Sequence, residues 1–281
     1  MPRRIAFINE KGGSGKTTLV ANLAYFLAQE EGLRTLAIDM DPQGQLGKVL
    51  GLGNSAPRRT SVDLLLDSVL RGEDASAALD EPTDRLPVIK TRVPNLDVIV
   101  SNKSLALFPA WAGNDRAEDP SGHLHERLQG APELQHYDMV LFDAPPSFGP
   151  LTLNVLRACN DVVIPVPLTY LALDGCAELV KTLELVRRRY DHPELAIRMV
   201  VPTFYRRTRM AEEILQALRD RFPAEISKTV VGFTVKIDEA QSRGLTLFET
   251  APRHPGTRTL SALGSELLER LRRPEPASPR Q

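Results

Sequence analysis

Residues 10–18 read EKGGSGKTT, and this glycine-rich run constrains the fold more than any other segment. In a phosphate-binding loop of the form G-x-x-x-x-G-K-[ST], backbone amides surround the phosphates, the lysine binds the terminal phosphates and the hydroxyl binds Mg²⁺. Glu10 holds the position of the first glycine, so the pattern fails there by one residue, and an extra lysine follows at Lys11. Because Lys11 is poorly placed to fold back onto its own nucleotide, it predicts contact with the phosphates of a facing subunit.

The segments on either side of the loop support this interpretation. An apolar run over residues 4–9 is typical of a buried parallel strand. Apolar residues then recur at helical spacing from Leu19 to Leu27, and Gly32 is a predicted stop. A strand, a glycine turn and a helix together direct the amides of the helix N-terminus at a phosphate.

Strand candidates alternate with helical patterns along the rest of the chain. The predicted strands cover residues 35–39, 96–101, 139–143, 162–166, 198–203 and 229–231. The predicted helices cover residues 61–70, 151–159, 175–190, 210–222 and 259–271. This alternation predicts an α/β fold of the P-loop NTPase type, with a mostly parallel twisted sheet, helices on both faces and ligands at the carboxyl ends of the strands. We expect one P-loop domain over residues 1–273, an irregular surface insertion at 109–122 around Trp111, and a disordered tail at 274–281.

Composition excludes several classes of function. The formal net charge of −1 means that any nucleic-acid contact must come from a local basic patch. Cys159 and Cys176 form neither a disulfide framework nor a C-x-x-C metal pair, so a reducing cytoplasm is the predicted compartment. We find no signal pattern and no apolar run long enough to span a bilayer.

Three segments are predicted to build one nucleotide site. In the first, Gly12, Gly13 and Gly15 let the backbone approach the phosphates, Lys16 meets the β- and γ-phosphates, and Thr17 ligates Mg²⁺. The full predicted phosphate-binding set is Lys11, Gly12, Gly13, Ser14, Gly15, Lys16, Thr17 and Thr18.

The other two segments supply carboxylates. Asp39 and Asp41 end a predicted strand, and side-chain alternation lets both point at the loop, one towards a metal-bound water and one towards the attacking water. Asp143 ends the apolar strand 139–143, which is the form of a Walker B segment completing the Mg²⁺ shell. An aspartate after a strand is often only a helix cap, but the joint occurrence with the loop disfavours that explanation.

The chain resembles the ParA/Soj-type partition ATPases of the deviant Walker A family, which includes MinD. The matching stretches are residues 11–18, 39–44, 142–147, 165–166 with 170–175, and 239–244. The resemblance implies an ATP-driven homodimer that binds double-stranded DNA without sequence preference and is released when a ParB-type partner stimulates hydrolysis. It also implies a nucleoid-associated cytoplasmic protein with slow intrinsic turnover, in which Lys11 acts across the dimer and Asp41 positions water. Asp39 and Asp143 would support Mg²⁺, while Glu10 and the segment around Trp111 depart from the family pattern.

ATP is the predicted nucleotide because the chain resembles partition ATPases and because a guanine-reading N-K-x-D motif is incomplete. Asn102 and Lys103 begin one, but Leu105 replaces the aspartate. The adenine pocket is predicted around Pro202, Thr203 and Phe204, after the strand 198–203.

DNA contact is predicted for an arginine cluster in the C-terminal third, namely Arg206, Arg207, Arg209 and Arg243. Such residues would neutralise phosphates and give salt-sensitive binding. The alternative is a solvated surface paired with Glu212, Glu213 and Asp220, which is the usual role of charge runs.

Two other functions of the same fold stay open. A MinD-like membrane switch would use the apolar stripe of the last helix, although core packing is the usual purpose of such a stripe, and membrane partners are not expected. An iron–sulfur relative would need more cysteines than this sequence has. His123 and His125 lie on different helix faces and are predicted to be exposed polar residues rather than metal ligands.

Overall fold

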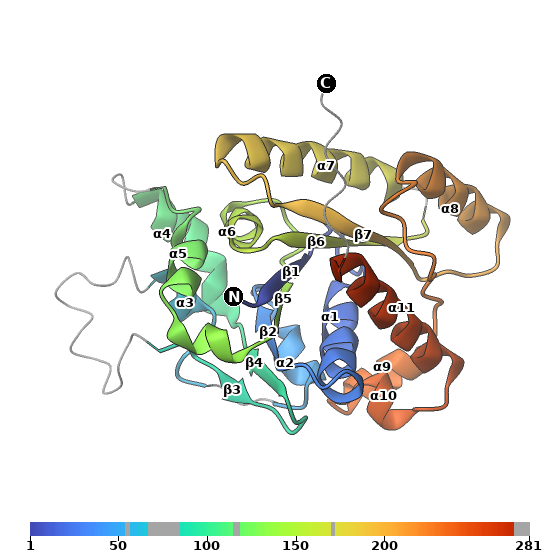
Figure 1. Cartoon of the computed structure of the whole chain (residues 1–281), viewed down its shortest axis with the longest axis horizontal. Coiled ribbons are helices and arrows are strands. Elements are labelled where there is room, and N and C mark those ends of the chain that lie inside the picture. The colour runs from blue at the N-terminus through green and yellow to red at the C-terminus, as the bar shows by residue number, and fades with distance from the viewer. Residues whose placement is uncertain (54–56, 67–84, 115–118, 170–171, 273–281) are drawn as a thin grey trace.

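The computed structural model describes residues 1–53, 57–66, 85–114, 119–169 and 172–272 (Figure 1). These residues form a seven-stranded sheet in the order β3-β4-β2-β5-β1-β6-β7, in which only the pairing of β3 with β4 is antiparallel. The strands are β1 (Arg3–Phe7), β2 (Thr35–Asp39), β3 (Ile89–Lys90), β4 (Leu96–Ile99), β5 (Met139–Asp143), β6 (Asp161–Pro167) and β7 (Ala196–Thr203). The mostly parallel α/β sheet expected from the sequence is therefore confirmed.

Helices cover both faces of the sheet (Figure 1). On one face lie α1 (Lys16–Tyr25), its π-helical extension η1 (Phe26–Glu30), α2 (Gln45–Val49), α9 (Val235–Ser242), α10 (Leu247–Thr250) and α11 (Pro255–Arg272). On the other lie α3 (Val62–Leu66), η2 (Lys103–Leu107), α4 (Phe108–Asn114), α5 (His123–Gln129), η3 (Pro132–His136), α6 (Pro150–Ala158), α7 (Ala172–Arg189) and α8 (Arg209–Arg221).

Strand alternation explains the two cores. In β1, Ile5 and Phe7 pack in one hydrophobic cluster with α1 and α11, whereas Ala6 belongs to the cluster under α6 and α7. All three side chains are fully buried, so the strand is apolar on both faces, as parallel strands between two helix layers are. This is why the sequence of the strand reads as a continuous apolar run.

The register of the central strands brings their carboxyl ends to one level. Phe7 of β1 pairs with Asp143 of β5, and Asp39 of β2 pairs with the same residue. The glycine-rich loop follows β1 directly. One end of the sheet therefore carries the loop and both strand-terminal aspartates.

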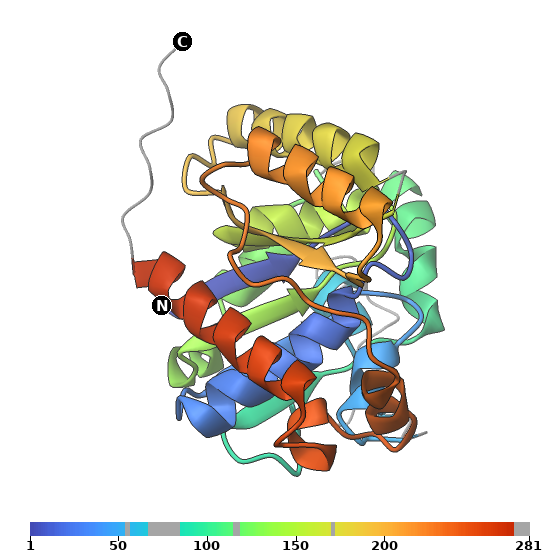
Figure 2. The same cartoon turned by 90° about the vertical axis from the view of Figure 1, so that its right-hand side faces the viewer.

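Helix α11 lies beside α1 in both views (Figures 1 and 2). Its apolar stripe is buried, with Leu260, Leu263 and Leu267 fully inaccessible. Gly264 faces Phe26, and a Cβ built at this glycine would lie 2.3 Å from the phenylalanine ring. The apolar stripe of α11 therefore packs in the core. Among the described residues, no helix is long and apolar enough to cross a membrane.

The structure corrects two sequence predictions of local structure. Residues 229–231 are not a strand: the segment 226–232 runs past β7 and makes only isolated bridges, Val200 with Ile226 and Tyr205 with Gly232. The segment 109–122 is not irregular throughout, because residues 109–114 are helical within α4. A proline at the start of a helix removes no intrahelical hydrogen bond, so Pro109 is tolerated there.

Other predictions fall outside the described residues or are refined. The predicted helix 61–70 is seen as α3, and residues 67–70 lie outside the described part. The predicted tail 274–281 lies outside it too. The predicted helices 151–159, 175–190, 210–222 and 259–271 appear with slightly shifted ends as α6, α7, α8 and α11.

Candidate nucleotide-binding site

The glycine-rich loop turns sharply between β1 and α1. Gly13 and Gly15 have φ of 69° and 95°, in the left-handed region where a side chain is strained, and Gly15 is the N-cap of α1. Lys16 is the first residue of that helix. Free amides of the first helical turn therefore face the loop, which is the arrangement that binds phosphate.

The loop is held against the sheet by side chains that lie outside the phosphate-loop sequence pattern. Asn9 donates from Nδ2 to the carbonyl of Pro165 at 2.6 Å, and its Oδ1 accepts from the Lys11 amide at 2.8 Å. Thr203 donates from Oγ1 to the Ser14 carbonyl at 3.0 Å. The loop is thus tied to the ends of β6 and β7, and sequence reasoning missed Asn9 because a single polar residue gives no pattern.

The two lysines of the loop point in different directions. Lys16 is 6% exposed and donates from Nζ to the Asn9 carbonyl at 3.0 Å. Burial lowers the pKa of Lys16, against the opposing effects of Asp143 and Asp41. Lys11 donates from Nζ to Thr169 Oγ1 at 2.8 Å, in an exposed contact after β6. Lys16 therefore serves the interior of the loop, while the Lys11 ammonium lies at the protein surface.

Asp143 lies directly beside Thr17. The Thr17 hydroxyl donates to Asp143 Oδ2 at 2.6 Å, and Asp143 is 1% exposed. Burial raises the pKa of Asp143 to about 7, although Thr17 and Lys16 oppose the shift. A carboxylate buried in this way gains from any cation placed next to it.

Asp39 and Asp41 occupy the neighbouring strand end. Asp39 is fully buried and accepts hydrogen bonds from the amides of Asp41 and Leu46, each at 3.0 Å. Burial and the Asp143 charge raise the pKa of Asp39 well above its usual value. Asp41 Oδ1 accepts from the Gln43 amide at 2.9 Å, and the Asp41 charge acts on both Lys16 and Asp143.

These side chains fit a magnesium ion. Asp143 Oδ1 is buried without a hydrogen-bond partner among the described residues, and the Thr17 hydroxyl lies next to it. Mg²⁺ prefers oxygen ligands and is usually held by one or two protein groups together with substrate phosphates. Consistent with this, the described residues contain no group of three or more His, Cys, Asp and Glu that could hold a metal alone.

A pocket opens beside the N-terminus of α1, where the sequence predicts the adenine, and is named the base pocket for that reason. It is lined by Gly15, Thr18, Thr203, Phe204 and, from a distant segment, residues 231–234, 237 and 238. Phe204 has a φ of 56°, and its ring lies 6.5 Å from the ring of Phe233. Pro202 does not line the pocket; its carbonyl accepts from the Val231 amide at 2.9 Å and holds the distant segment in place.

The four arginines predicted to contact DNA are not brought to one place. Arg206 lies 4.1 Å over the ring of Phe233, and Arg209 pairs with Glu213 at 2.8 Å on the exposed face of α8. Arg207 is exposed between them. Arg243 ends α9 and lines a different cavity, near α2.

The remaining candidates have structural environments. His123 is 6% exposed and its Nδ1 lies 3.2 Å from the Leu65 carbonyl, so the prediction of an exposed residue is wrong for it. His125, two residues on along α5, contacts Gln129. Cys159 and Cys176 are buried free thiols, and burial raises the pKa of both.

A phosphate-binding loop between a strand and a helix, with a hydroxyl and an aspartate paired at its end, defines a P-loop NTPase. The family model AAA_31, described as an AAA domain, matches residues 2–197. The chain is 37% identical over 270 residues to the chromosome-partitioning ATPase Soj of Thermus thermophilus, covering 96% of each chain. It is 33% identical to the sporulation initiation inhibitor protein Soj of Bacillus subtilis, covering 95% of this chain and 98% of that one. The chain therefore belongs to the Soj/ParA family of chromosome-partitioning ATPases.

Solved structures share the fold of this chain. A cobyrinic acid a,c-diamide synthase from Mycobacterium smegmatis, with a bound ATP analogue and magnesium, has a TM-score of 0.76 and 27% identity, covering 97% of this chain and 96% of that chain. The cell division ATPase MinD of Pyrococcus furiosus has a TM-score of 0.70 and 20% identity, covering 96% and 98%, which shows a shared fold.

Proposed function

We propose that this protein is a DNA partition ATPase in which ATP binding joins two copies of the chain. The dimer binds double-stranded DNA without reading its sequence, and hydrolysis stimulated by a ParB-type partner releases it. Intrinsic turnover is slow, so that the bound state lasts until the partner arrives. The protein acts in the cytoplasm on the nucleoid, as one domain over residues 1–273.

ATP and Mg²⁺ are the nucleotide and the metal, and together they supply the γ-phosphate and the positive charge that activates it. Lys16 binds the β- and γ-phosphates, and the amides of Gly12 to Thr18 surround them. Thr17 ligates Mg²⁺, and Asp39 and Asp143 hold its waters. Asp41 orients the attacking water, since its charge acts on both Lys16 and Asp143.

The adenine occupies the pocket between Phe204 and Phe233, with Thr203 fixing the loop beside it. Arg206 packs on the outer face of Phe233. This contact supports a DNA surface close to the nucleotide, because Arg206 packs on Phe233, which lines the base pocket. Arginines presented this way neutralise backbone phosphates without reading bases.

The observation that carries the proposal is the position of Lys11. Lys16 already fills the inner face of the loop and is 6% exposed, whereas the Lys11 ammonium is bonded to Thr169 at the surface. A cation held at the open edge of a phosphate loop can reach the nucleotide of a second copy. Family membership over nearly the whole chain supports the same dimer.

The test is the mass of the protein in solution with each nucleotide, measured by light scattering after size exclusion. We expect a dimer with ATP and Mg²⁺ and a monomer with ADP. Lys11→Ala should bind ATP yet stay monomeric, while the control Lys236→Ala, which removes an exposed lysine paired with Glu239 on α9, should dimerise normally. Dimers of Lys11→Ala at the wild-type ATP concentration would contradict the role of Lys11.

No observation favours the membrane alternative. An interfacial helix needs its apolar face free to enter lipid. In α11 that face is occupied by contacts with α1 and η1, and its leucines are buried.

A further inference from the structure

Gln241, in the last turn of α9, reaches the start of α1 from a distant part of the chain. Its Nε2 donates to Thr18 Oγ1 at 2.8 Å, across a separation of 223 residues in the sequence. The side chain of Gln241 is half-buried, and it also lines a cavity that Thr17 borders. None of the roles assigned to the nucleotide site uses this glutamine.

Thr18 lies between the two parts of the nucleotide site. Together with Gly15 it lines the base pocket. It also follows Thr17 directly, and the Thr17 hydroxyl contacts Asp143 where the side chains fit magnesium. A nucleotide with its base in the pocket and its terminal phosphates at Lys16 must therefore pass Thr18 with its α-phosphate.

The hydroxyl of Thr18 keeps a hydrogen that it can donate. A threonine hydroxyl donates one hydrogen bond and accepts up to two. Gln241 fills one acceptor position, and Thr18 Oγ1 makes no second hydrogen bond within the described part of the chain. Because hydrogen bonds in a chain polarise one another, the bond from the amide also makes the hydroxyl a better donor. An α-phosphate oxygen beside Thr18 would accept that hydrogen.

The end of α9 that carries Gln241 is packed tightly against the end of α2. Gly51 and Gly244 have φ of 83° and 66°, and a Cβ built at Gly244 would lie 2.9 Å from the Gly51 Cα. The two helix ends approach this closely because neither residue has a side chain. Gln241 therefore stands on a helix end that cannot shift towards α2.

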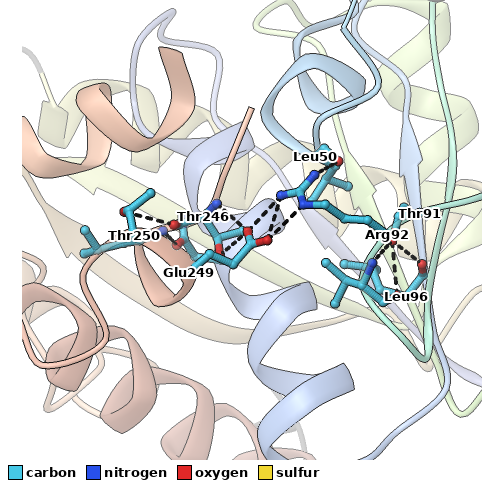
Figure 3. A network of polar contacts seen from close by, with 10 residues as sticks. Leu50, Thr91, Arg92, Leu96, Thr246, Glu249 and Thr250 are labelled. Atoms are coloured by element: carbon cyan, nitrogen blue, oxygen red, sulfur yellow. Dashed lines mark hydrogen bonds and ion pairs between the residues drawn. The ribbon is translucent and has the colours of Figure 1, made fainter. Parts of the chain in front are cut away.

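The end of α2 is held in turn by Arg92, in the turn between β3 and β4. Its guanidinium donates to the Leu50 carbonyl and makes two hydrogen bonds of 2.9 Å to the Glu249 carboxylate, as Figure 3 shows. Glu249 also accepts from the Thr246 amide at the start of α10. These contacts join α2, α10 and the sheet, so the support beneath Gln241 is rigid.

We propose that Gln241 is a positioning residue for the α-phosphate of the bound nucleotide. It acts through Thr18: its amide holds the hydroxyl oxygen as an acceptor and leaves the hydrogen directed at the phosphate. A bond that only tied α9 to α1 would give no preference for one phosphate oxygen of the ligand. The inference rests on the proposed binding of adenine in the base pocket, and it is independent of dimerisation and of DNA.

The test is the binding of ADP with Mg²⁺ to the full chain, measured by calorimetry. Gln241→Met removes the amide at nearly constant length and should weaken binding by about three- to tenfold, the usual effect of losing one neutral hydrogen bond. Gln241→Glu should weaken it further, because the carboxylate accepts the hydroxyl hydrogen itself and repels the phosphate. Ser242→Ala is the control on the same helix. The Ser242 hydroxyl donates to the Glu239 carbonyl, and the variant should bind ADP as wild type does.

Two further measurements separate positioning from a structural effect. In the Thr18→Val background, which has no hydroxyl to orient, Gln241→Met should cause no additional loss of affinity. The second measurement uses the Rp and Sp isomers of ADP with sulfur on the α-phosphate, because sulfur accepts hydrogen bonds weakly. Wild type should bind one isomer more tightly, and Gln241→Met should reduce that preference.

Three results would each overturn the proposal: wild-type ADP affinity in Gln241→Met, an equal loss in the Thr18→Val background, or an undiminished preference between the isomers. A general loosening of the fold would lower affinity in both backgrounds and so counts as the second of these. Phe233→Ala tests the base pocket by itself. Wild-type ADP affinity in that variant would reject the adenine assignment, whichever way Gln241→Met behaves, so the two failures are distinguishable.

Discussion

Asp143 illustrates how one side chain can oppose folding and serve the site. It is buried beside Thr17 with one oxygen lacking a partner among the described residues, and its pKa is raised to about 7 by burial. Between pH 4 and pH 7 the folded chain therefore holds a proton on Asp143 that the unfolded chain releases. The contribution of this group to stability falls as pH rises through that window and is lowest above pH 7. A bound cation would remove the penalty.

We predict that Asp143→Asn raises the unfolding temperature of the nucleotide-free protein at pH 8, and that the gain shrinks towards pH 5. The amide avoids the cost of a buried carboxylate, which in wild type grows as pH rises from about 4 and is complete above the folded pKa of about 7. Thermal unfolding without Mg²⁺ at both pH values measures this. Asp138→Asn is the control and should have the same effect at both pH values, because Arg34 lowers the pKa of Asp138 and its contribution is lost only as pH falls below the unfolded pKa of about 4. A gain from Asp143→Asn that is equal at both pH values would rule out the raised pKa.

We also predict that Asp41→Ala slows ATP turnover by about 10²–10⁴-fold, the usual contribution of a group that orients or activates water. Affinity for ATP should stay at the wild-type level, because Lys16 and the loop amides bind the phosphates. Steady-state hydrolysis and nucleotide titration separate the two effects. Gln43→Ala in the same turn is the control, since only the Gln43 backbone amide contacts Asp41. Normal turnover by Asp41→Ala would refute the role.

For single residues, the sequence predicted those that belong to a motif and missed those that do not. The loop, Asp39, Asp41 and Asp143 could be found because glycines, lysines and strand-terminal acids occur at fixed spacings. Asn9 and Thr169 are single polar residues in loops, and only the folded chain brings Asn9 to the Pro165 carbonyl and Thr169 to Lys11. Phe233 reaches the base pocket from a segment whose path along β7 has no periodic pattern.

Elements were predicted well where burial dictates the pattern. β2 and β5 are buried on both faces, and their apolar runs match the observed strands residue for residue. The segment 229–231 is made of β-branched residues but lies at the edge of β7, where two isolated bridges replace a ladder. Short elements such as β3 and α10 are stabilised by tertiary contacts, including the Arg92–Glu249 pair, that no local pattern encodes.

The contact between α11 and η1 can be tested by replacing Gly264 with alanine. Whether the replacement stabilises or destabilises the protein decides the question. Gly→Ala in a helix usually stabilises it by about 0.5–1 kcal/mol. At Gly264 the added methyl would meet the Phe26 ring at 2.3 Å, so we expect Gly264→Ala to destabilise the protein by about 1–3 kcal/mol, measured by urea unfolding.

Two variants make that result specific. Gly175 of α7 has no atom within 4 Å of a built Cβ, so Gly175→Ala should stabilise the protein. Phe26→Leu makes room next to α11, and Gly264→Ala should cost less in that background. If Gly264→Ala stabilises the protein in the wild-type background, α11 does not pack on Phe26 as described.

In the folded molecule the nucleotide site lies at one end of the sheet, and exposed arginines lie beside it. Arg206, Arg207 and Arg209 follow β7 directly, next to the base pocket, whereas Arg243 lies across α9. A DNA surface built on the first three would change with the state of the nucleotide because Arg206 packs on Phe233.

We predict that replacing these three arginines by glutamine lowers DNA affinity and reduces the dependence on salt. The slope of log affinity against log salt should fall by about 0.9 for each DNA phosphate that the variant no longer neutralises. Anisotropy titrations over a salt series measure it. A matched triple replacement of Arg187, Arg188 and Arg189 at the end of α7 removes equal charge and should leave the slope unchanged. An unchanged slope in the first variant would move the DNA surface elsewhere.

Asn22 lies within the apolar interior of α1 at 1% exposure, where its amide bonds the Thr18 carbonyl and its Oδ1 accepts from the Leu247 amide at 3.0 Å. During synthesis the phosphate loop leaves the ribosome more than 200 residues before that partner. Until α10 and the leucines of α11 arrive, the helix behind the loop exposes an apolar face and an unsatisfied amide oxygen. We therefore expect chains to acquire nucleotide affinity only once α10 and α11 have been made, so that products truncated before Leu247 form no ATP-loaded protomers.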